Sequence, residues 1–251
     1  MLKIAISGCN GKMGQVLSGL SLADPEIQVL WGLDIHETPS AAYPVYTLLQ
    51  EDLPLPDVLI DFSHPDVLEQ LLVWAVARHV PCVIATTGIS DSQKDLLRHT
   101  AMEIPVFYSA NMSLGVNVVI DIVKRITRVL EEKFDIEIVE KHHNQKVDAP
   151  SGTALAIADA INEVLSVKQE YIYDRHSRRK KRGRDEIGIH AVRGGTIVGE
   201  HSIIYAGNDE IIEIKHTALS KIVFAEGAMK AARFLAGRSP GYYSMKDMMN
   251  P

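Results

Sequence analysis

The sequence predicts an α/β protein with a doubly wound parallel sheet, followed by a second, α+β domain with an open, mainly β sheet. Two observations carry this prediction. Over the first hundred residues, short apolar runs alternate with amphipathic helical runs, which is typical of a parallel sheet covered on both faces. After Asn111 this alternation stops, and strand patterns dominate residues 188–218. We therefore place the domain boundary between residues 112 and 113.

The elements of the first domain follow from local hydrophobic patterns. Apolar runs predict buried strands at residues 3–7, 27–33, 57–62, 81–85 and 105–109. Helical spacing of apolar residues predicts a helix that ends near residue 23, and further helices at 64–79 and 91–102. Each helix joins two strands, as a doubly wound sheet requires.

The second domain has a different order of elements. A long helix is expected at residues 113–131, where Ser113 can cap its start. A strand at 135–140, a polar loop at 142–150 and an alanine-rich helix at 151–165 follow. Strands are predicted at 189–193, 196–205 and 210–216, and a closing helix at 222–235. Gly207-Asn208-Asp209 is a hairpin signal between the last two strands.

Composition excludes several classes of protein. The chain has 251 residues and a net charge of −6, so no bulk attraction to nucleic acid or to an anionic membrane is expected. No apolar run is long enough to span a membrane, and no secretory leader is visible before the first strand. Cys9 and Cys82 form neither a disulfide framework nor a metal-ligand spacing. These features predict a cytoplasmic protein with reduced thiols.

A glycine-rich turn lies between the first strand and the first helix. Its spacing, Gly8-x-x-Gly11-x-x-Gly14, allows a tight turn and a close approach of the backbone to a pyrophosphate at the helix N-terminus. Asp34 ends the next strand twenty positions later, where a Rossmann-type domain places a carboxylate beside the adenine ribose. The turn predicts a nicotinamide dinucleotide, NADH or NADPH. The alternative is a strand-turn-helix without a ligand.

Asp34 bears on the choice between the two nucleotides. A carboxylate accepts hydrogen bonds from a ribose diol but repels a 2′-phosphate, and Ile35 and His36 follow where an arginine could have offset that repulsion. We expect NADH to bind at least as well as NADPH. Lys12 is either a partial counter-charge for the phosphate or an ordinary solvated lysine.

Two small-residue segments follow strands at the same edge of the expected sheet. They are Ala85-Thr86-Thr87-Gly88 and Ser109-Ala110-Asn111-Met112. Ligands of doubly wound sheets bind beyond the carboxyl ends of the strands, so these segments can leave room for a nicotinamide ring. Each is equally compatible with plain loop sequence.

The densest group of polar residues lies at 140–154, between an apolar strand and an apolar helix. His143 and Lys146 supply positive charge, and the N–H groups of Gly152 and Thr153 at a helix N-terminus can bind a carboxylate. His142 titrates near neutrality and suits general acid or base catalysis, while Lys146 suits proton donation. Adjacent histidines of an extended segment point to opposite sides, so no metal site is expected. Ser151 lies outside any nucleophile elbow, which argues against a serine hydrolase.

Together these motifs resemble the 4-hydroxy-tetrahydrodipicolinate reductase (dihydrodipicolinate reductase) family of bacterial lysine and diaminopimelate synthesis. The resemblance covers nearly the whole chain, and the 140–154 motif is its most specific part. The other motifs that carry it are Gly8 to Gly14, Asp61-Phe62-Ser63, Ala85 to Gly88, Asn111 to Asn117 and Val192 to His201.

The resemblance implies a role for each matching residue. His142 and Lys146 match the family's proton-transfer residues, and His143, Gly152 and Thr153 match its substrate contacts. The residues that match its cofactor contacts are Gly8, Cys9, Asn10, Gly11, Lys12, Met13, Asp34, Ala85, Thr86, Thr87, Ser109, Ala110, Asn111 and Met112. The implied reaction passes a hydride from nicotinamide to a cyclic unsaturated dicarboxylate. The chain departs from the family at Ala85, where many members have glycine, and at Met112, where phenylalanine is common.

The resemblance also implies an organisation. Residues 1–112, completed by residues 221–251, would bind the dinucleotide, and residues 113–220 would bind substrate and form a homotetramer through their sheet. A rival hypothesis is a nicotinamide-sensing regulator, and a third is a related dehydrogenase with an amino-acid substrate.

One basic run stands apart from these motifs. Residues 175–184 carry seven lysines and arginines. The run is interpreted as a solvated loop, as a segment that steers an anionic substrate, or as a nucleic-acid patch.

Overall fold

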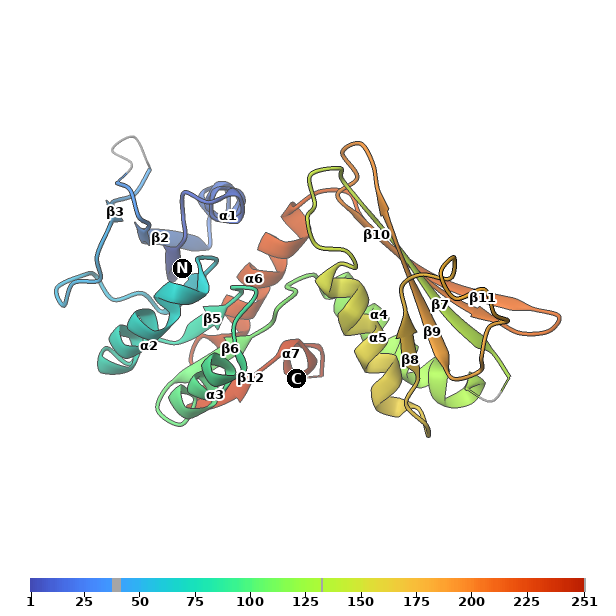
Figure 1. Cartoon of the computed structure of the whole chain (residues 1–251). Helices are drawn as coiled ribbons and strands as arrows, with labels where there is room; N and C mark the ends of the chain where they lie inside the picture. The colour runs from blue at the N-terminus through green and yellow to red at the C-terminus, as the bar shows by residue number, and fades with distance from the viewer. Residues whose placement is uncertain (38–41, 132, 251) are drawn as a thin grey trace. The chain divides into compact units, whose positions relative to one another are not determined.

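The computed structural model describes residues 1–37, 42–131 and 133–250 (Figure 1). Its chain forms two compact units. Unit 1 contains Met1–Leu114 and Lys221–Pro251, and unit 2 contains Gly115–Ser220. Unit 1 is therefore built from both ends of the sequence.

Unit 1 is built around a parallel sheet whose order, in the described residues, is β12-β6-β5-β4-β1-β2-β3. Its strands are β1 (Leu2–Ser7), β2 (Ile27–Leu33), β3 (Val45–Tyr46), β4 (Val58–Asp61), β5 (Cys82–Ile84), β6 (Pro105–Tyr108) and β12 (Gly241–Tyr243). Chain order runs outward from β1 in both directions, so the sheet is doubly wound and its fold class is confirmed. The central strands β1, β4 and β5 are apolar and buried because helices cover both faces.

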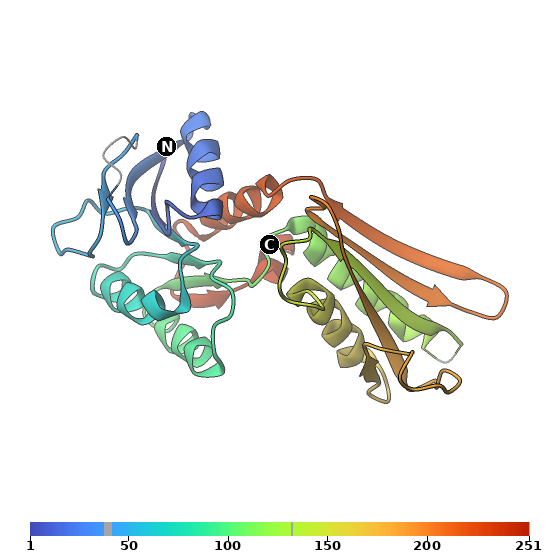
Figure 2. The same ribbon diagram turned by 45° about the horizontal axis from the view of Figure 1, so that its top comes forward.

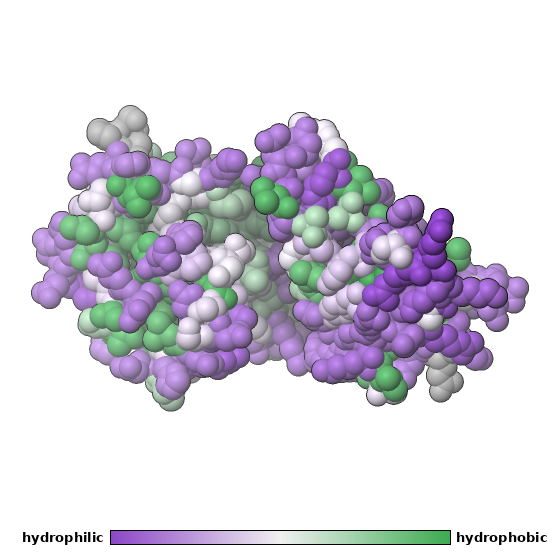
Figure 3. All heavy atoms as spheres, in the orientation of Figure 1, coloured by the Kyte–Doolittle hydropathy of each residue, from purple (hydrophilic) through white to green (hydrophobic). Residues whose placement is uncertain are grey.

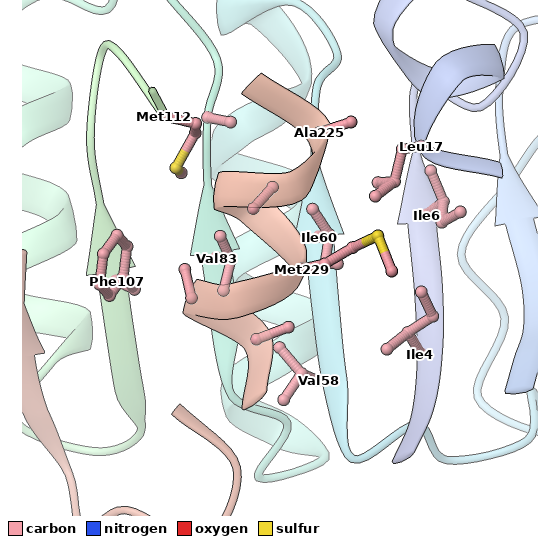
Figure 4. Close-up of a cluster of buried hydrophobic side chains, with 14 of the residues drawn as sticks. Ile4, Ile6, Leu17, Val58, Ile60, Val83, Phe107, Met112, Ala225 and Met229 are labelled. Carbon is pink, nitrogen blue, oxygen red and sulfur yellow. The ribbon is translucent and has the colours of Figure 1, made fainter. Parts of the chain in front are cut away.

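Helices cover the two faces of this sheet in separate layers. The helices of unit 1 are α1 (Lys12–Ala23), the 3-10 turn η1 (Pro65–Val67), α2 (Leu68–Ala77), α3 (Asp91–Thr100), α6 (Ile222–Leu235) and α7 (Met245–Met249). Figure 4 shows α6 crossing one face, with Met229 directed toward Ile60 and Ile4. The opposite face packs against α2 and α3 around Trp31 and Trp74. Because the strands pair parallel, their carboxyl ends lie at one edge of the sheet.

Unit 2 contains a mixed sheet of order β11-β10-β7-β9-β8 in the described residues. Its strands are β7 (Asp135–His142), β8 (Glu170–Ile172), β9 (Glu186–Arg193), β10 (Gly199–Ala206) and β11 (Ile211–Ala218). The hairpin β10–β11 is antiparallel, and β7 pairs antiparallel with β10 and parallel with β9. Figure 2 shows α4 (Leu114–Leu130) and α5 (Gly152–Val164) on one face of this sheet. The core of the unit lies between those helices and the strands.

Three sequence predictions need correction. The strand expected at 196–205 begins only at Gly199, because the chain turns at Gly195, whose φ is +50°. The strand expected to end at residue 140 continues to His142, since Lys141 and His142 pair with the end of β9. The helix expected at 64–79 starts as the 3-10 turn η1 and ends at Ala77.

The basic run lies in the segment that joins β8 to β9, where Figure 3 shows the most hydrophilic side chains of unit 2 gathered. Several of its cations are bound to carboxylates of the neighbouring strands. Arg175 donates to Glu137 at 2.5 Å and to Glu186 at 2.9 Å, and Arg182 donates to Asp135 at 2.7 Å. The interpretation of the whole run as a solvated loop is therefore wrong for these two arginines.

Candidate active site

The glycine-rich turn joins β1 to α1 in unit 1. Gly8 has a φ of +76°, a conformation that favours glycine, and its N–H donates to the carbonyl of Leu33 at 2.8 Å. A Cβ on Gly14 would lie 2.1 Å from the Gly8 carbonyl oxygen, so only glycine fits there. Gly11 is the N-cap of α1 and has no side chain to cap the helix, which leaves its first N–H groups for a ligand. This backbone fits a pyrophosphate.

Asp34 lies directly beside the turn. Its carboxylate accepts the N–H of Asn10 at 2.9 Å and that of Ile35 at 2.8 Å. A pocket of about 360 Å³ opens here between polar and apolar walls. Its lining includes Gly8, Gly11, Asp34, Leu48, Leu49 and Phe62. The apolar lining residues can pack on an adenine ring, and the Asp34 carboxylate can accept hydrogen bonds from its ribose. The residues present therefore fit a dinucleotide.

The other turn residues take different positions. Cys9 is buried in the core of unit 1, where burial and the Asp34 carboxylate raise the pKa of its thiol to about 11, so it offers the ligand only backbone groups. Lys12 is exposed and Met13 packs partly against the core. The sequence did not distinguish these three roles, because a turn motif specifies backbone rather than side-chain direction.

The segments Ala85 to Gly88 and Ser109 to Met112, which follow β5 and β6, form hydrogen bonds with residues of the sheet. The hydroxyl of Thr86 donates to Asp61 at 2.5 Å, and the N–H of Ser109 donates to the carbonyl of Ile84 at 3.2 Å. The hydroxyl of Ser109 donates to the carbonyl of Asn111 at 2.7 Å. Ala85 and Met112 are buried, whereas Thr87 and Ala110 are exposed. The segments thus keep fixed loops at the edge where ligands of such sheets bind.

Asp61 is a further polar residue at this edge of the sheet, and the sequence did not lead us to predict it as a site residue. It is fully buried at the end of β4 and accepts hydrogen bonds from Ser63 and Thr86, each at 2.5 Å from the hydroxyl oxygen. A carboxylate at the end of an otherwise apolar strand was the available signal. Its position organises the loops that follow β4 and β5.

In unit 2, His142 is the last residue of β7 and is only 8 % exposed. Its Nδ1 lies 2.7 Å from Oε2 of Glu140, and its ring packs edge-to-face on His201 with centroids 5.2 Å apart. Burial lowers the pKa of His142, Glu140 opposes that shift, and the charges of Lys146 and Arg193 add to it. The ring is therefore largely neutral near pH 7, where a proton can be taken up or released at moderate cost.

The helix N-terminus of α5 lies in the same unit. Ser151 caps the helix, because its hydroxyl accepts the N–H of Ala154 at 3.2 Å. Lys146 pairs with Asp148 at 2.8 Å, and the Lys146 ammonium and the Gly152 N–H both help to hold the pKa of Asp148 below its usual value despite partial burial. The carboxylate of Asp148 thus occupies the kind of anion site that the sequence predicted for Lys146 and Gly152.

His143 and Thr153 are partly buried next to these groups in the chain. His201, on β10, belongs to a family motif, but no role was predicted for it from the sequence. It is buried, its Nε2 lies 3.0 Å from the hydroxyl of Ser151, and burial lowers its pKa to about 4. The predicted residues of unit 2 therefore gather around β7 and the start of α5.

The described residues contain no group of three or more histidine, cysteine or acidic side chains placed to bind a metal ion. Within the same residues, no helix combines the length and apolar character needed to cross a membrane.

The glycine-rich turn of unit 1 fits a dinucleotide, and unit 2 contains a buried histidine suited to proton transfer; both features are typical of one class of protein, the nicotinamide-dependent oxidoreductases. Two sequence profiles match the chain within this class. "Dihydrodipicolinate reductase, N-terminus" matches residues 2–112, and "Dihydrodipicolinate reductase, C-terminus" matches residues 115–249. The chain belongs to the dihydrodipicolinate reductase family, as its motifs predicted.

Individual relatives agree with the profiles. The chain is 53 % identical over 249 residues to the 4-hydroxy-tetrahydrodipicolinate reductase of Caldanaerobacter subterraneus subsp. tengcongensis, covering 99 % of this chain and 98 % of that protein. It is 47 % identical over 250 residues to the enzyme of the same name from Clostridium tetani, covering 100 % and 98 %. A dipicolinate-bound dihydrodipicolinate reductase from Paenisporosarcina sp. TG-14 has the same fold, with a TM-score of 0.81, 24 % identity and 97 % of both chains covered.

Proposed function

We propose that the protein reduces 4-hydroxy-tetrahydrodipicolinate to tetrahydrodipicolinate with a nicotinamide nucleotide, in lysine and diaminopimelate biosynthesis. The names of its full-length relatives support this substrate. The observation that carries the proposal is the pairing of buried His142 with the anion-binding residues Lys146 and Gly152 in one unit. A cyclic dicarboxylate needs both a carboxylate site and a proton donor.

Each residue then has a chemical task. Lys146, His143 and the N–H groups of Gly152 and Thr153 bind a substrate carboxylate in place of Asp148. A nicotinamide nucleotide, when bound, supplies the hydride. When protonated, His142 can donate a proton from Nε2, and Lys146 carries further protons on its ammonium, so both can neutralise the negative charge that builds on the substrate. We assign the dinucleotide to unit 1 and the substrate to unit 2.

We infer that NADH serves at least as well as NADPH. The support is Asp34, whose carboxylate lines the pocket together with neutral and apolar residues, and whose charge repels a 2′-phosphate. The cofactor contacts are proposed from the turn, Asp34, and the segments Ala85 to Thr87 and Ser109 to Met112.

We further propose a cytoplasmic homotetramer formed through the sheet of unit 2, without a membrane or nucleic-acid partner. One face of that sheet packs on α4 and α5, and its edge strand β11 exposes alternate side chains. The net charge of −6 and two buried free cysteines support the location.

Steady-state kinetics with freshly generated substrate and each nucleotide tests this function. Substrate-dependent loss of absorbance at the reduced nicotinamide band is expected, with kcat/KM for NADH equal to or above that for NADPH. Binding of NADH without turnover would favour a sensor. Formation of NADH from an amino acid and NAD would favour an amino-acid dehydrogenase.

A further inference from the structure

A buried carboxylate lies at the centre of the polar cluster in unit 2. The side chain of Glu140 has no exposed surface, and it lies on β7 two residues before His142, on the same face of the strand. Four hydrogen bonds reach its two oxygens. Their donors are Nδ1 of His142 at 2.7 Å, Nη1 and Nη2 of Arg193 at 2.8 and 2.7 Å, and the N–H of Ser151 at 2.9 Å.

The charge on Glu140 determines the protonation of its neighbour. Burial opposes ionisation of Glu140, but the hydrogen bonds from Arg193, His142 and Ser151 outweigh burial and lower the pKa of its carboxyl group. An ionised carboxylate can only accept hydrogen bonds. Nδ1 of His142 must therefore carry a proton, and Nε2 is the atom left to gain or lose one.

The same carboxylate also holds the start of α5. Ser151, whose N–H it accepts, is the N-cap residue directly before Gly152. Arg193 donates hydrogen bonds to Glu140 from both Nη atoms, and its Nη2 also donates to the backbone carbonyl of Asp148 at 2.5 Å. Glu140 and Arg193 thus connect the histidine, the loop before α5 and the helix N-terminus.

We propose that Glu140, held in place by two hydrogen bonds from Arg193, is a positioning residue. It keeps the His142 ring protonated at Nδ1 and aligned with the N-terminus of α5. This inference rests on the proposed reductase function, in which His142 acts at Nε2. Glu140 itself touches no reacting atom, because its two oxygens are fully used by protein donors.

Charged and titratable groups face His142 from each neighbouring element. Glu140 lies on β7, Arg193 on β9, His201 on β10, and Lys146 in the loop before α5. Of these groups, Glu140 raises the pKa of His142, whereas Lys146 and Arg193 lower it. Replacing Glu140 with neutral glutamine should lower the pKa of His142 further. If His142 must be protonated to donate, turnover declines as pH rises through that pKa, and the decline moves to lower pH.

The chain offers a matched control on the same strand. Glu137 also accepts hydrogen bonds from two arginines and a histidine, but it lies on the opposite face of β7. Its donors are Nη2 of Arg175 at 2.5 Å, Nε of Arg182 at 3.0 Å and Nε2 of His190 at 2.8 Å. Glu137→Gln therefore removes a comparable charge without touching the histidine of the site.

The kinetic test compares Glu140→Gln with Glu137→Gln. We expect Glu140→Gln to lower kcat by about a hundredfold, with NADH affinity unchanged and the high-pH decline of kcat moved to lower pH. Glu137→Gln should keep the wild-type kcat and pH profile. Equal kcat values and superimposable profiles in the two variants would overturn the proposal.

A spectroscopic test uses the wild-type protein and so does not depend on the folding of a variant. In ¹⁵N-histidine-labelled protein, the neutral ring of His142, assigned by its loss in His142→Gln, should be protonated at Nδ1, and Nε2 should be the nitrogen whose shift titrates. A neutral ring protonated at Nε2 would refute the role of Glu140. Because this readout needs no turnover, it separates failure of the inference from failure of the reductase function.

Discussion

Gly199 lies against the imidazole of His142, so closely that a Cβ built on it would come within 3.1 Å of Nε2. Gly199 begins β10, the strand that pairs with β7, and it is buried. The absence of a side chain at this position leaves open the space around the one ring nitrogen that can exchange a proton.

The first prediction concerns this space. Gly199→Ala should push the His142 ring aside by a few tenths of an ångström and lower kcat by about tenfold, with NADH affinity unchanged. Gly194→Ala is the control, because a Cβ there meets no atom within 4 Å. Wild-type kcat values in both variants would contradict this prediction, because they would show that the His142 ring can tilt without a loss of activity.

The second prediction concerns the histidine itself. His142→Gln removes the titrating nitrogen and should reduce kcat by about 10²- to 10⁴-fold, while the dissociation constant for NADH stays within twofold. His190→Gln, on the neighbouring strand β9 but paired with Glu137, should behave like the wild type. Unchanged turnover in His142→Gln would remove His142 from its proposed role.

The third prediction concerns nucleotide choice. Asp34→Asn removes the charge that we propose faces the adenine ribose, so the ratio of kcat/KM for NADH to that for NADPH should fall by about tenfold. Glu37→Gln removes an exposed carboxylate three residues away and should leave the ratio unchanged. A wild-type enzyme that strongly prefers NADPH would show that Asp34 does not set the choice.

The fourth prediction concerns the glycine-rich turn between β1 and α1. Gly14→Ala places a Cβ 2.1 Å from the Gly8 carbonyl oxygen, so the turn must open, and NADH titrations should show lost binding. Gly19→Ala lies on the same helix with nothing within 4 Å, and it should stabilise the protein by about 1 kcal/mol with binding intact. Normal NADH binding by Gly14→Ala would contradict the assignment of the turn.

The fifth prediction concerns stability against pH. The pKa of His201 is lowered to about 4 in the folded protein, so the unfolded chain binds a proton first as pH falls below its usual value of 6.5. Above pH 6.5 His201 does not reduce the free energy of unfolding. As pH falls from 6.5 to 4, preferential protonation of the unfolded chain lowers that free energy by about 3 kcal/mol.

Denaturant titrations at pH 7.5 and 4.5 measure this effect. The loss of unfolding free energy between the two should be smaller in His201→Gln than in the wild type. His176→Gln, an exposed histidine of unit 2, should keep the wild-type loss. Identical losses in all three proteins would show that His201 does not titrate differently on folding.

Much of the fold was predictable because long periodic segments specify their own structure. The central strands of unit 1 and helices such as α4 and α5 have apolar patterns that bury one face or both. The strands β3, β8 and β12 were missed, since two or three residues carry no periodicity. Pairing of β12 with β6 joins residues more than 130 positions apart in the chain, and no local pattern contains that information.

The site was predictable to a different degree. Residue types and spacing led to His142 and the start of α5 as candidates, because catalysis near neutrality and anion binding need groups of these kinds. Residue types and spacing could not predict that Glu140 forms hydrogen bonds with His142 and Arg193. That arrangement depends on the register of β7 with β9. Residue types and spacing also gave no sign that Arg175 and Arg182 fold back onto Glu137.

The composition of unit 1 from both ends of the chain has a consequence for synthesis. Residues 221–250 supply α6, which covers one face of the sheet, and β12, its edge strand. A ribosome delivers every residue of unit 2 before these segments emerge. The apolar face formed by β1, β4 and β5 therefore stays uncovered by α6 while residues 115–220 are synthesised. During that interval the nascent chain is exposed to chaperones and to aggregation.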